Sequence, residues 1–222
     1  MIGQTFKKNY QNKPKSSLMI AQGMGGVTLQ TKDFSLDQTV SDLNAVLEKA
    51  RMDKPVIIVA HSVGGVYARH FINQHPDKVA GLILVDTRNE FFKDDSTEEY
   101  NDAFFNSQGQ STNKILARLG AIRLFGEKTL KGMHKFVSTE KYANVQYDAP
   151  FFKVLDEEIK QIPENVDRLK ELQPLKNMPL TIITPEVADT QAVELGFSSE
   201  QEKTLNKKWF NAQRGINRTF NK

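Results

Sequence analysis

Cysteine is absent from this chain of 222 residues. Its absence excludes disulfide bonds, zinc sites built on thiolates and a cysteine nucleophile, and leaves the redox compartment open. No stretch approaches the roughly 18 apolar residues of a membrane-spanning helix. The segment from Met1 to Tyr10 holds no apolar core of signal-peptide length. We therefore expect a cytoplasmic protein without a membrane span.

A strong charge of either sign is also missing. The net charge is +3, from 30 Lys and Arg against 27 Asp and Glu. The basic stretches Lys7–Lys15 and Lys203–Lys222 do not interleave basic and aromatic residues as nucleic-acid sites do. No GxGxxG turn is followed by an acidic residue at ribose-contacting spacing, so nucleotide binding is disfavoured. We expect no nucleic-acid partner, no cofactor and no metal.

Apolar runs and helical stripes define the fold class. Val56–Ala60 and Val79–Val85 have the composition of buried strands, and Gly64–Gln74 between them favours a helix. Strand, helix and strand within about 30 residues form a βαβ unit, which requires a parallel sheet and a right-handed crossover. The predicted class is α/β, with a mostly parallel sheet flanked by helices.

Other elements extend this unit. Ser17–Gln22 has a strand-like pattern, Ser35–Ala50 carries a capped apolar stripe, and the sheet is predicted to resume at Pro179–Thr184. A final amphipathic helix is expected from about Ser199 to Phe210 or somewhat beyond. Between them, residues 87–178 show only helical patches, such as Lys114–Leu124 and Leu155–Leu175. We predict one core domain from residues 1–86 and 179–222, with 87–178 inserted as a helical cap.

The clearest motif is Val-Ile-Ile-Val-Ala-His-Ser-Val-Gly-Gly at residues 56–65. A buried strand delivers Ser62 to a sharp turn, and Ala60 and Gly64 are small enough to let the outgoing helix lie close to the strand. This pattern predicts a nucleophile elbow. The alternative is a serine in a glycine-rich turn without chemistry, but the spacing of a phosphate-binding loop is absent.

Residues 34–86 resemble the middle of an α/β-hydrolase, from the capped helix through His-Ser-Val-Gly-Gly to Gly-Leu-Ile-Leu-Val-Asp. Ile115–Leu124 resembles a cap helix of bacterial members of that family. Met178–Thr184 and Trp209–Gln213 resemble the next strand and the helix after it. The resemblance implies a serine hydrolase, with Ser62 as nucleophile and the backbone N–H of Val63 as one oxyanion donor.

The second oxyanion donor in this family comes from a His-Gly-x-Gly loop. Gln22-Gly23-Met24-Gly25 is similar, so the Met24 N–H is the candidate, with a plain glycine turn as the alternative. Met24 precedes Ser62 by only 38 positions, which leaves no room for a helix and strand that family members carry there. In another alignment these glycines match a later turn of the family, and both the first part of the family's sheet and the oxyanion loop are missing.

The orienting acid has two candidates. Asp86 ends the strand that follows the elbow, 24 positions after Ser62, and parallel strands bring their carboxyl ends to one edge of the sheet. Asp189 follows the later strand, which is the commoner family position, but Pro185–Ala188 departs from the expected turn. We favour Asp86, whose alternative role is capping a backbone turn.

The general base is the least defined member of the site. The family places its histidine near the carboxyl terminus, but no histidine follows His134. His61 is expected to point into the sheet, His75 to be exposed, and His70 to lie roughly 12 Å along the outgoing helix from Ser62. His134 in the cap is the remaining candidate. Otherwise a partner chain or residues outside this sequence must supply the base.

Two functions follow from these predictions. The first is a serine hydrolase acting on a small ester or amide, with a small-molecule acyl substrate. The second is an inactive or truncated α/β-hydrolase-like protein that serves as a binding module. The sequence defines neither the identity of the substrate nor an oligomeric state.

Overall fold

The computed structural model describes residues 35–93, 95–108, 149–175, 177–186 and 192–220. Within them, residues 36–105 and 161–220 belong to one compact unit. That unit contains the sheet, the elbow and all the contacts considered below. The predicted strand Ser17–Gln22 and the predicted helix Lys114–Leu124 lie outside the described residues.

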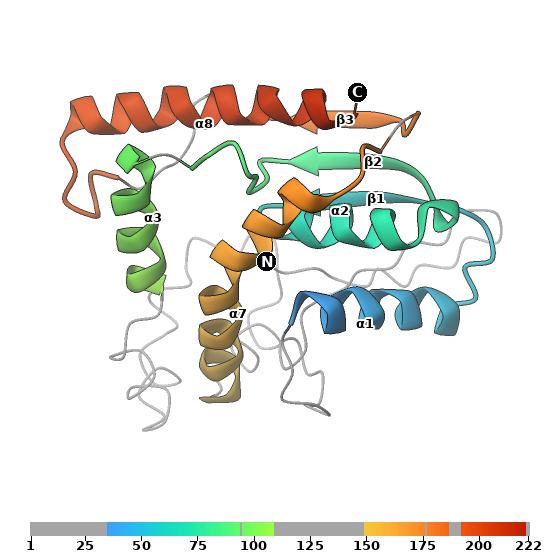
Figure 1. Cartoon of the computed structure of the whole chain (residues 1–222). Helices are drawn as coiled ribbons and strands as arrows, with labels where there is room; N and C mark the ends of the chain where they lie inside the picture. Colours follow the sequence, from blue (N-terminus) through green and yellow to red (C-terminus); the bar gives the residue numbers. More distant parts are fainter. Residues whose placement is uncertain (1–34, 94, 109–148, 176, 187–191, 221–222) are drawn as a thin grey trace, which may run out of the picture. The chain divides into compact units, whose positions relative to one another are not determined.

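Three parallel strands form the sheet (Figure 1). They are β1 (Val56–His61), β2 (Val79–Val85) and β3 (Leu180–Ile183), and they are ordered β1-β2-β3. Ala60 is paired with Leu84, and Leu84 with Ile182, which aligns the carboxyl ends of the strands. Helix α2 (Gly64–Gln74) and the short turn η1 (Pro76–Lys78) connect β1 to β2. The predicted βαβ unit and the α/β class are therefore confirmed.

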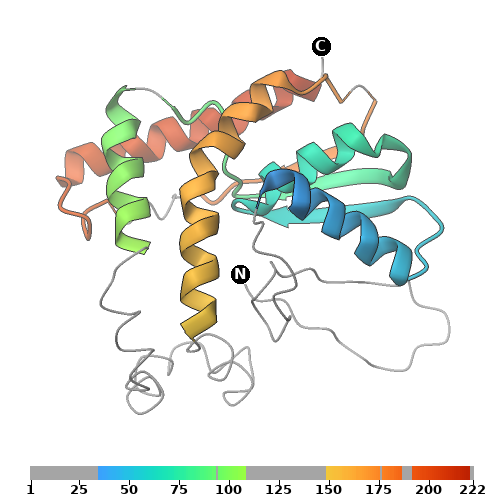
Figure 2. The ribbon, with the colours of Figure 1, turned by 60° about the horizontal axis from the view of Figure 1, so that its bottom comes forward.

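One face of the sheet carries the core. Helix α2 contacts β1 and β2, and α1 (Leu36–Lys49) packs against α2, as Figures 1 and 2 show. The last turns of α8 (Ser199–Phe220) add Ile216 and Phe220 to the same cluster. Its largest fully buried side chains include Leu36, Phe71, Ile72, Leu82 and Leu84. Burial of apolar side chains from three helices stabilises the sheet from this side.

The opposite face of the sheet is apolar and exposed. Side chains alternate between the two faces of a strand, and Ile57 and Val59 are each 66% exposed, with Ile183 at 51%. The prediction of a fully buried strand at Val56–Ala60 was therefore wrong for every second residue. An unbroken apolar run is typical of a parallel strand covered on both faces, and the helices that pack on this sheet among the described residues do so on the other face.

Between β2 and β3 the described residues form mainly helices. These elements are α3 (Asp95–Gln108), α7 (Ala149–Asp167) and the short turn η3 (Arg168–Glu171). Tyr100 and Phe104 of α3 pack with Phe92 and with Trp209 of α8 in a second cluster. Tyr100 and Phe104 thus join α3 to α8 through this second cluster. The cap boundaries at 87 and 178 stay a prediction.

Helix α8 ends at Phe220, ten residues after Phe210, whereas the prediction ended it at Phe210 or somewhat beyond. The physical reason is that Ala212, Ile216 and Phe220 recur every four residues and are all buried. Residues four apart lie on one side of a helix, so the apolar stripe that begins at Leu205 runs on to the end of α8. Gly215 lets α8 lie close to Phe91, because a Cβ at this position would be only 2.8 Å from the Phe91 ring.

Candidate active site

Ser62 occupies the turn between β1 and α2, as the elbow motif predicts. Its backbone is in the left-handed region, with φ of 53°, which is strained for a residue with a side chain. Its N–H donates to the Val85 carbonyl at 3.2 Å, and its own carbonyl accepts from Gly65 at 3.1 Å and Arg88 at 3.2 Å. Three main-chain hydrogen bonds therefore hold the half-buried serine at the carboxyl edge of the sheet.

At this turn the start of α2 lies close to the loop after β2, and this close approach depends on Gly65 rather than on Gly64. A Cβ at Gly65 would lie 2.5 Å from Thr87 Cγ2 and 2.7 Å from Thr87 Cβ, whereas a Cβ at Gly64 would meet nothing within 4 Å. The role given to Gly64 in the sequence analysis was therefore wrong. Ala60 is buried, as expected, on the core face beneath the elbow.

Val63 follows Ser62 as the N-cap of α2, with helical φ and ψ of −60° and −25°. Its backbone N–H stands at the amino end of an 11-residue helix. The unpaired N–H groups of a first helical turn carry partial positive charge, which favours an anion beside them. The position fits an oxyanion donor.

Asp86 lies directly after β2 and also has a left-handed backbone, with φ of 46°. Its N–H donates to the Ile183 carbonyl at 2.8 Å. Its Oδ1 accepts a hydrogen bond from Trp209 Nε1 at 2.7 Å. The carboxylate is therefore fixed at the same sheet edge as Ser62, and its hydrogen-bond partner among the described residues is an indole rather than a histidine.

Arg88, which no sequence pattern singled out, lies two residues after Asp86. Its N–H bonds the Ser62 carbonyl, and its Nη1 donates to Asn101 Oδ1 at 2.9 Å. Its guanidinium carbon lies 4.9 Å from the Phe104 ring centre and 5.4 Å from that of Trp209. Burial lowers the pKa of Arg88 from its ordinary value, against smaller opposing electrostatic effects of Tyr100 and Asp86. No local motif signals this arrangement.

A buried ion pair braces the helix behind the elbow. Arg69 of α2 forms two hydrogen bonds of 2.7 Å with Glu90, and the two side chains are 3% and 5% exposed. Glu90 lies on the same loop as Arg88, four residues after Asp86. This bidentate pair joins α2 to the segment that carries the candidate acid.

Three of the four histidines, His61, His70 and His75, lie among the described residues. His70 is 4% exposed, and its Nε2 has no partner among the described residues. Burial lowers its pKa to about 4, and a hydrogen bond to the Asn165 carbonyl raises it in opposition. His75 is half-buried rather than exposed as predicted, because its ring packs at a tilt of 45° against Phe71, with the ring centres 4.9 Å apart. His61 is exposed on the open face, which corrects the prediction that it points into the sheet.

Three predicted site residues fall outside the described residues. They are Met24, the second oxyanion donor; His134, the candidate base; and Asp189, the alternative acid. Their roles stay predictions. Among the described residues, no group of three or more His, Asp or Glu side chains is placed to hold a metal ion.

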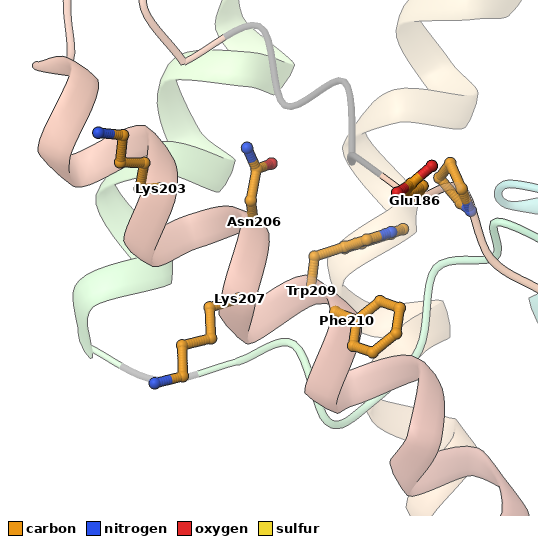
Figure 3. A pocket seen from close by; sticks show the side chains of 7 residues that line it. Glu186, Lys203, Asn206, Lys207, Trp209 and Phe210 are labelled. Atoms are coloured by element: carbon orange, nitrogen blue, oxygen red, sulfur yellow. The ribbon is translucent and has the colours of Figure 1, made fainter.

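A pocket of about 360 Å³ opens between α8 and the end of β3 (Figure 3). Ser62 does not line it. Trp209 does, and it therefore separates this pocket from Asp86. The lining combines two aromatic rings, two lysines and three other side chains: Trp209, Phe210, Lys203, Lys207, Pro185, Glu186 and Asn206.

Comparison with known families decides what this arrangement represents. The family model for the alpha/beta hydrolase fold matches residues 10–124, about half of the chain. The chain belongs to the α/β-hydrolase family. The elbow at Ser62, the parallel sheet and the helix behind the elbow are the features of that family described above.

Two relatives of this α/β-hydrolase are an esterase and a lipase. Lipase LipV of Mycobacterium tuberculosis is 43% identical over 53 residues, 24% of this chain and 20% of the lipase. The pimeloyl-[acyl-carrier protein] methyl ester esterase of Chromobacterium violaceum is 28% identical over 109 residues, 47% of this chain and 43% of the esterase. The matched regions thus span less than half of either relative.

A solved structure shares the fold of this α/β-hydrolase. A thermophilic esterase from Thermogutta terrifontis superposes with a TM-score of 0.50 at 14% identity, over 90% of this chain and 74% of that chain. At this level of identity the likeness shows the fold alone. No helix among the described residues is long and apolar enough to cross a membrane.

Proposed function

We propose that this α/β-hydrolase is a serine hydrolase of small ester or amide substrates, with Ser62 as its nucleophile. The observation that carries the proposal is the left-handed backbone of Ser62 at the strand-to-helix turn. A strained residue of this kind persists where the surrounding structure holds it, and such residues cluster at active sites. The esterase and lipase relatives favour acyl substrates.

In this proposal the Ser62 hydroxyl attacks the carbonyl carbon of the substrate while a base takes its proton. The Val63 N–H, and the Met24 N–H as second donor, stabilise the oxyanion of the tetrahedral intermediate. The intermediate collapses when the C–O or C–N bond breaks and the protonated base gives its proton to the leaving group. Water then hydrolyses the acyl-serine by the same steps.

Asp86 is proposed as the acid that orients the base. A carboxylate accepts several hydrogen bonds on its two oxygens, so the bond from Trp209 to Oδ1 is compatible with a second bond from an imidazole N–H. His134 is the proposed base within this chain. A histidine from a partner chain or from residues outside this sequence is the alternative source.

A fluorophosphonate probe tests the proposal, because it labels only an activated serine. We expect the wild-type protein to be labelled at Ser62, as located by peptide mass spectrometry, and Ser62→Ala to lose the label. His134→Ala should lose it too if His134 is the base, whereas His75→Ala, which removes a histidine packed against Phe71, should keep it. Absence of labelling in the wild-type protein would overturn the proposal.

A second candidate function is a binding module that keeps the elbow without turnover. The observation in its favour is that neither His61, His70 nor His75 is hydrogen-bonded to Asp86. Residual catalysis of about 10³-fold over water can persist without a base, so weak turnover alone does not separate the two functions. Stoichiometric labelling of Ser62 by the fluorophosphonate probe does separate the two functions.

A further inference from the structure

We propose that the pocket between α8 and the end of β3 binds a short peptide with a free amino end, a free carboxyl end and an apolar side chain. The cavity holds about 360 Å³, which is at the small end of the range for ligand sites. Ser62 is not among the residues that line it. The inference therefore concerns a second site and stands apart from the proposed function.

Opposite charges lie at the two ends of this pocket. Figure 3 shows Lys203 and Lys207 of α8 to one side of Asn206, and Glu186, three residues after β3, to the other. The three charged residues are exposed, and none of them forms an ion pair with another residue that the structure describes. A molecule with a carboxylate at one end and an ammonium at the other matches this arrangement.

Asn206 supplies the polar group in the middle of the pocket. Its Oδ1 is buried and has no hydrogen-bond partner among the described residues. A buried acceptor is costly to leave unpaired, so a donor on a bound molecule stabilises it. A side-chain amide both donates and accepts. The N–H and C=O of a peptide group pair with it in both ways.

Two aromatic rings form the apolar part of the wall. Trp209 is 9% exposed, and its ring is held by an edge-to-face contact with Phe92 and by the hydrogen bond to Asp86. Phe210 is 37% exposed, and the guanidinium of Arg214 lies 4.6 Å from its ring centre. Rings that are already held in place lose little freedom when an apolar side chain packs on them.

The spacing along α8 suits a dipeptide. Lys203 precedes Trp209 by six residues, about 9 Å along the helix axis, and Lys207 precedes it by two. An extended dipeptide spans about 7 Å. Its carboxylate therefore meets a lysine ammonium while its side chain lies on the rings and its amino end faces Glu186.

Trp209 is the only tryptophan of the chain, so its fluorescence reports on occupancy of the pocket. We expect the dipeptide Ala-Leu to change this fluorescence saturably, and titration calorimetry to give the same dissociation constant. Ser62→Ala protein is used for both, because the proposed nucleophile is then absent and failure of the hydrolase leaves the result unaffected. Gly-Gly, which lacks the apolar side chain, should bind about tenfold more weakly.

Two blocked peptides test the charged ends separately. N-acetyl-Ala-Leu lacks the ammonium and Ala-Leu amide lacks the carboxylate, and each should bind about threefold more weakly than Ala-Leu, as for exposed ion pairs. Glu186→Gln should weaken binding of Ala-Leu by a similar factor and leave binding of N-acetyl-Ala-Leu unchanged. Lys203→Gln combined with Lys207→Gln should weaken binding of Ala-Leu and leave binding of the amide unchanged.

Glu200→Gln and Lys93→Gln are the matched controls, because each removes one exposed charge that does not line the pocket. Both should bind Ala-Leu as tightly as the parent protein. The inference is overturned if Ala-Leu produces neither heat nor a fluorescence change, or if Ala-Leu and its two blocked forms bind equally. It is also overturned if Glu186→Gln weakens N-acetyl-Ala-Leu as much as it weakens Ala-Leu.

Discussion

Trp209 donates its indole N–H to Asp86 Oδ1 at 2.7 Å, across 123 positions of sequence. Trp209 is 9% exposed and packs edge-to-face on Phe92 at 4.8 Å, so the ring that holds Asp86 is itself held by the second apolar cluster. The bond therefore links α8 to the carboxyl end of β2. It also fixes the rotamer of the proposed orienting acid.

Removing this hydrogen bond should affect both stability and activity. Trp209→Phe keeps an aromatic ring but leaves a partly buried carboxylate without its donor. We expect the free energy of unfolding to fall by about 1–3 kcal/mol, as measured by urea denaturation. If Asp86 orients the base, kcat should also fall with little change in KM.

Phe210→Leu is the control for Trp209→Phe, because Phe210 is the adjacent ring of α8, 37% exposed, and takes no part in the bond. A double variant with Asp86→Ala tests the coupling directly. The Trp209→Phe effect on stability should shrink in that background, and simple additivity of the two effects would contradict the interaction.

The two glycines after the elbow should respond in opposite ways to alanine. Gly65→Ala places a Cβ against the buried Thr87 side chain, 2.5 and 2.7 Å from two of its atoms, and should cost about 1–3 kcal/mol by overpacking. Gly64→Ala meets no atom within 4 Å and should be neutral or stabilising by up to about 1 kcal/mol. Urea unfolding curves measure both.

Thr87→Ser serves to test the cause in the Gly65→Ala protein. Removing Cγ2 deletes the closest contact, so the double variant should recover part of the lost stability. The steric explanation is wrong if Gly64→Ala destabilises as much as Gly65→Ala, or if Thr87→Ser restores nothing.

The buried pair of Arg69 and Glu90 predicts a strong asymmetry between single and double variants. Arg69→Met leaves the Glu90 carboxylate, 5% exposed, without its partner, and should cost about 3–5 kcal/mol. Arg69→Met with Glu90→Leu removes both charges and should recover most of that loss. Lys93→Met breaks the exposed pair with Asp167 and should change stability little. A double variant as unstable as the single one would argue against this account.

His70 predicts a specific pH dependence of stability. Its pKa is about 4 in the folded state because burial disfavours the charged ring, against an ordinary value of 6.5. The unfolded chain therefore binds the proton more tightly, and stability falls as pH drops from 6.5 towards 4, with no further contribution below that. The full effect is about 3 kcal/mol.

Unfolding free energies measured between pH 4 and 7 on wild type and His70→Leu test this linkage. The fall in the free energy of unfolding between about pH 6.5 and pH 4 should be smaller in His70→Leu than in wild type. His75→Gln, which changes a half-buried histidine one residue past the same helix, should retain the wild-type slope. Equal slopes in wild type and His70→Leu would show that other groups dominate acid unfolding.

The local parts of this fold could be predicted from the sequence because each is encoded in neighbouring residues. The bounds of α2 and β2 match the prediction, since Pro76 interrupts the chain between the helical segment and the apolar run of the strand. The elbow at Ser62 could be predicted for the same reason. The spacing of apolar residues within a segment indicates whether it forms a helix or a strand.

Contacts between distant segments could not be predicted in the same way. Trp209 bonds Asp86, and the Thr87 side chain leaves no room for a Cβ at residue 65. Both contacts join residues that are far apart in the chain. The unbroken apolar run of β1 predicted burial on both faces, yet Ile57 and Val59 are exposed. Which helices cover which face depends on the assembly of the whole sheet, and no pattern within the strand determines it.

Backbone strain at Ser62 predicts a gain in stability when the candidate nucleophile is replaced by glycine. A left-handed conformation costs roughly 1–2 kcal/mol for a residue with a Cβ, and glycine avoids that cost while gaining freedom in the unfolded chain. We expect Ser62→Gly to stabilise the protein by up to about 1 kcal/mol, measured as a raised urea midpoint at constant slope. Ser62→Ala, which keeps the Cβ, should show no such gain. Equal stability of the glycine and alanine variants would mean that relief of strain does not exceed the entropic cost of the glycine, and the structural argument for an active-site elbow would be weakened.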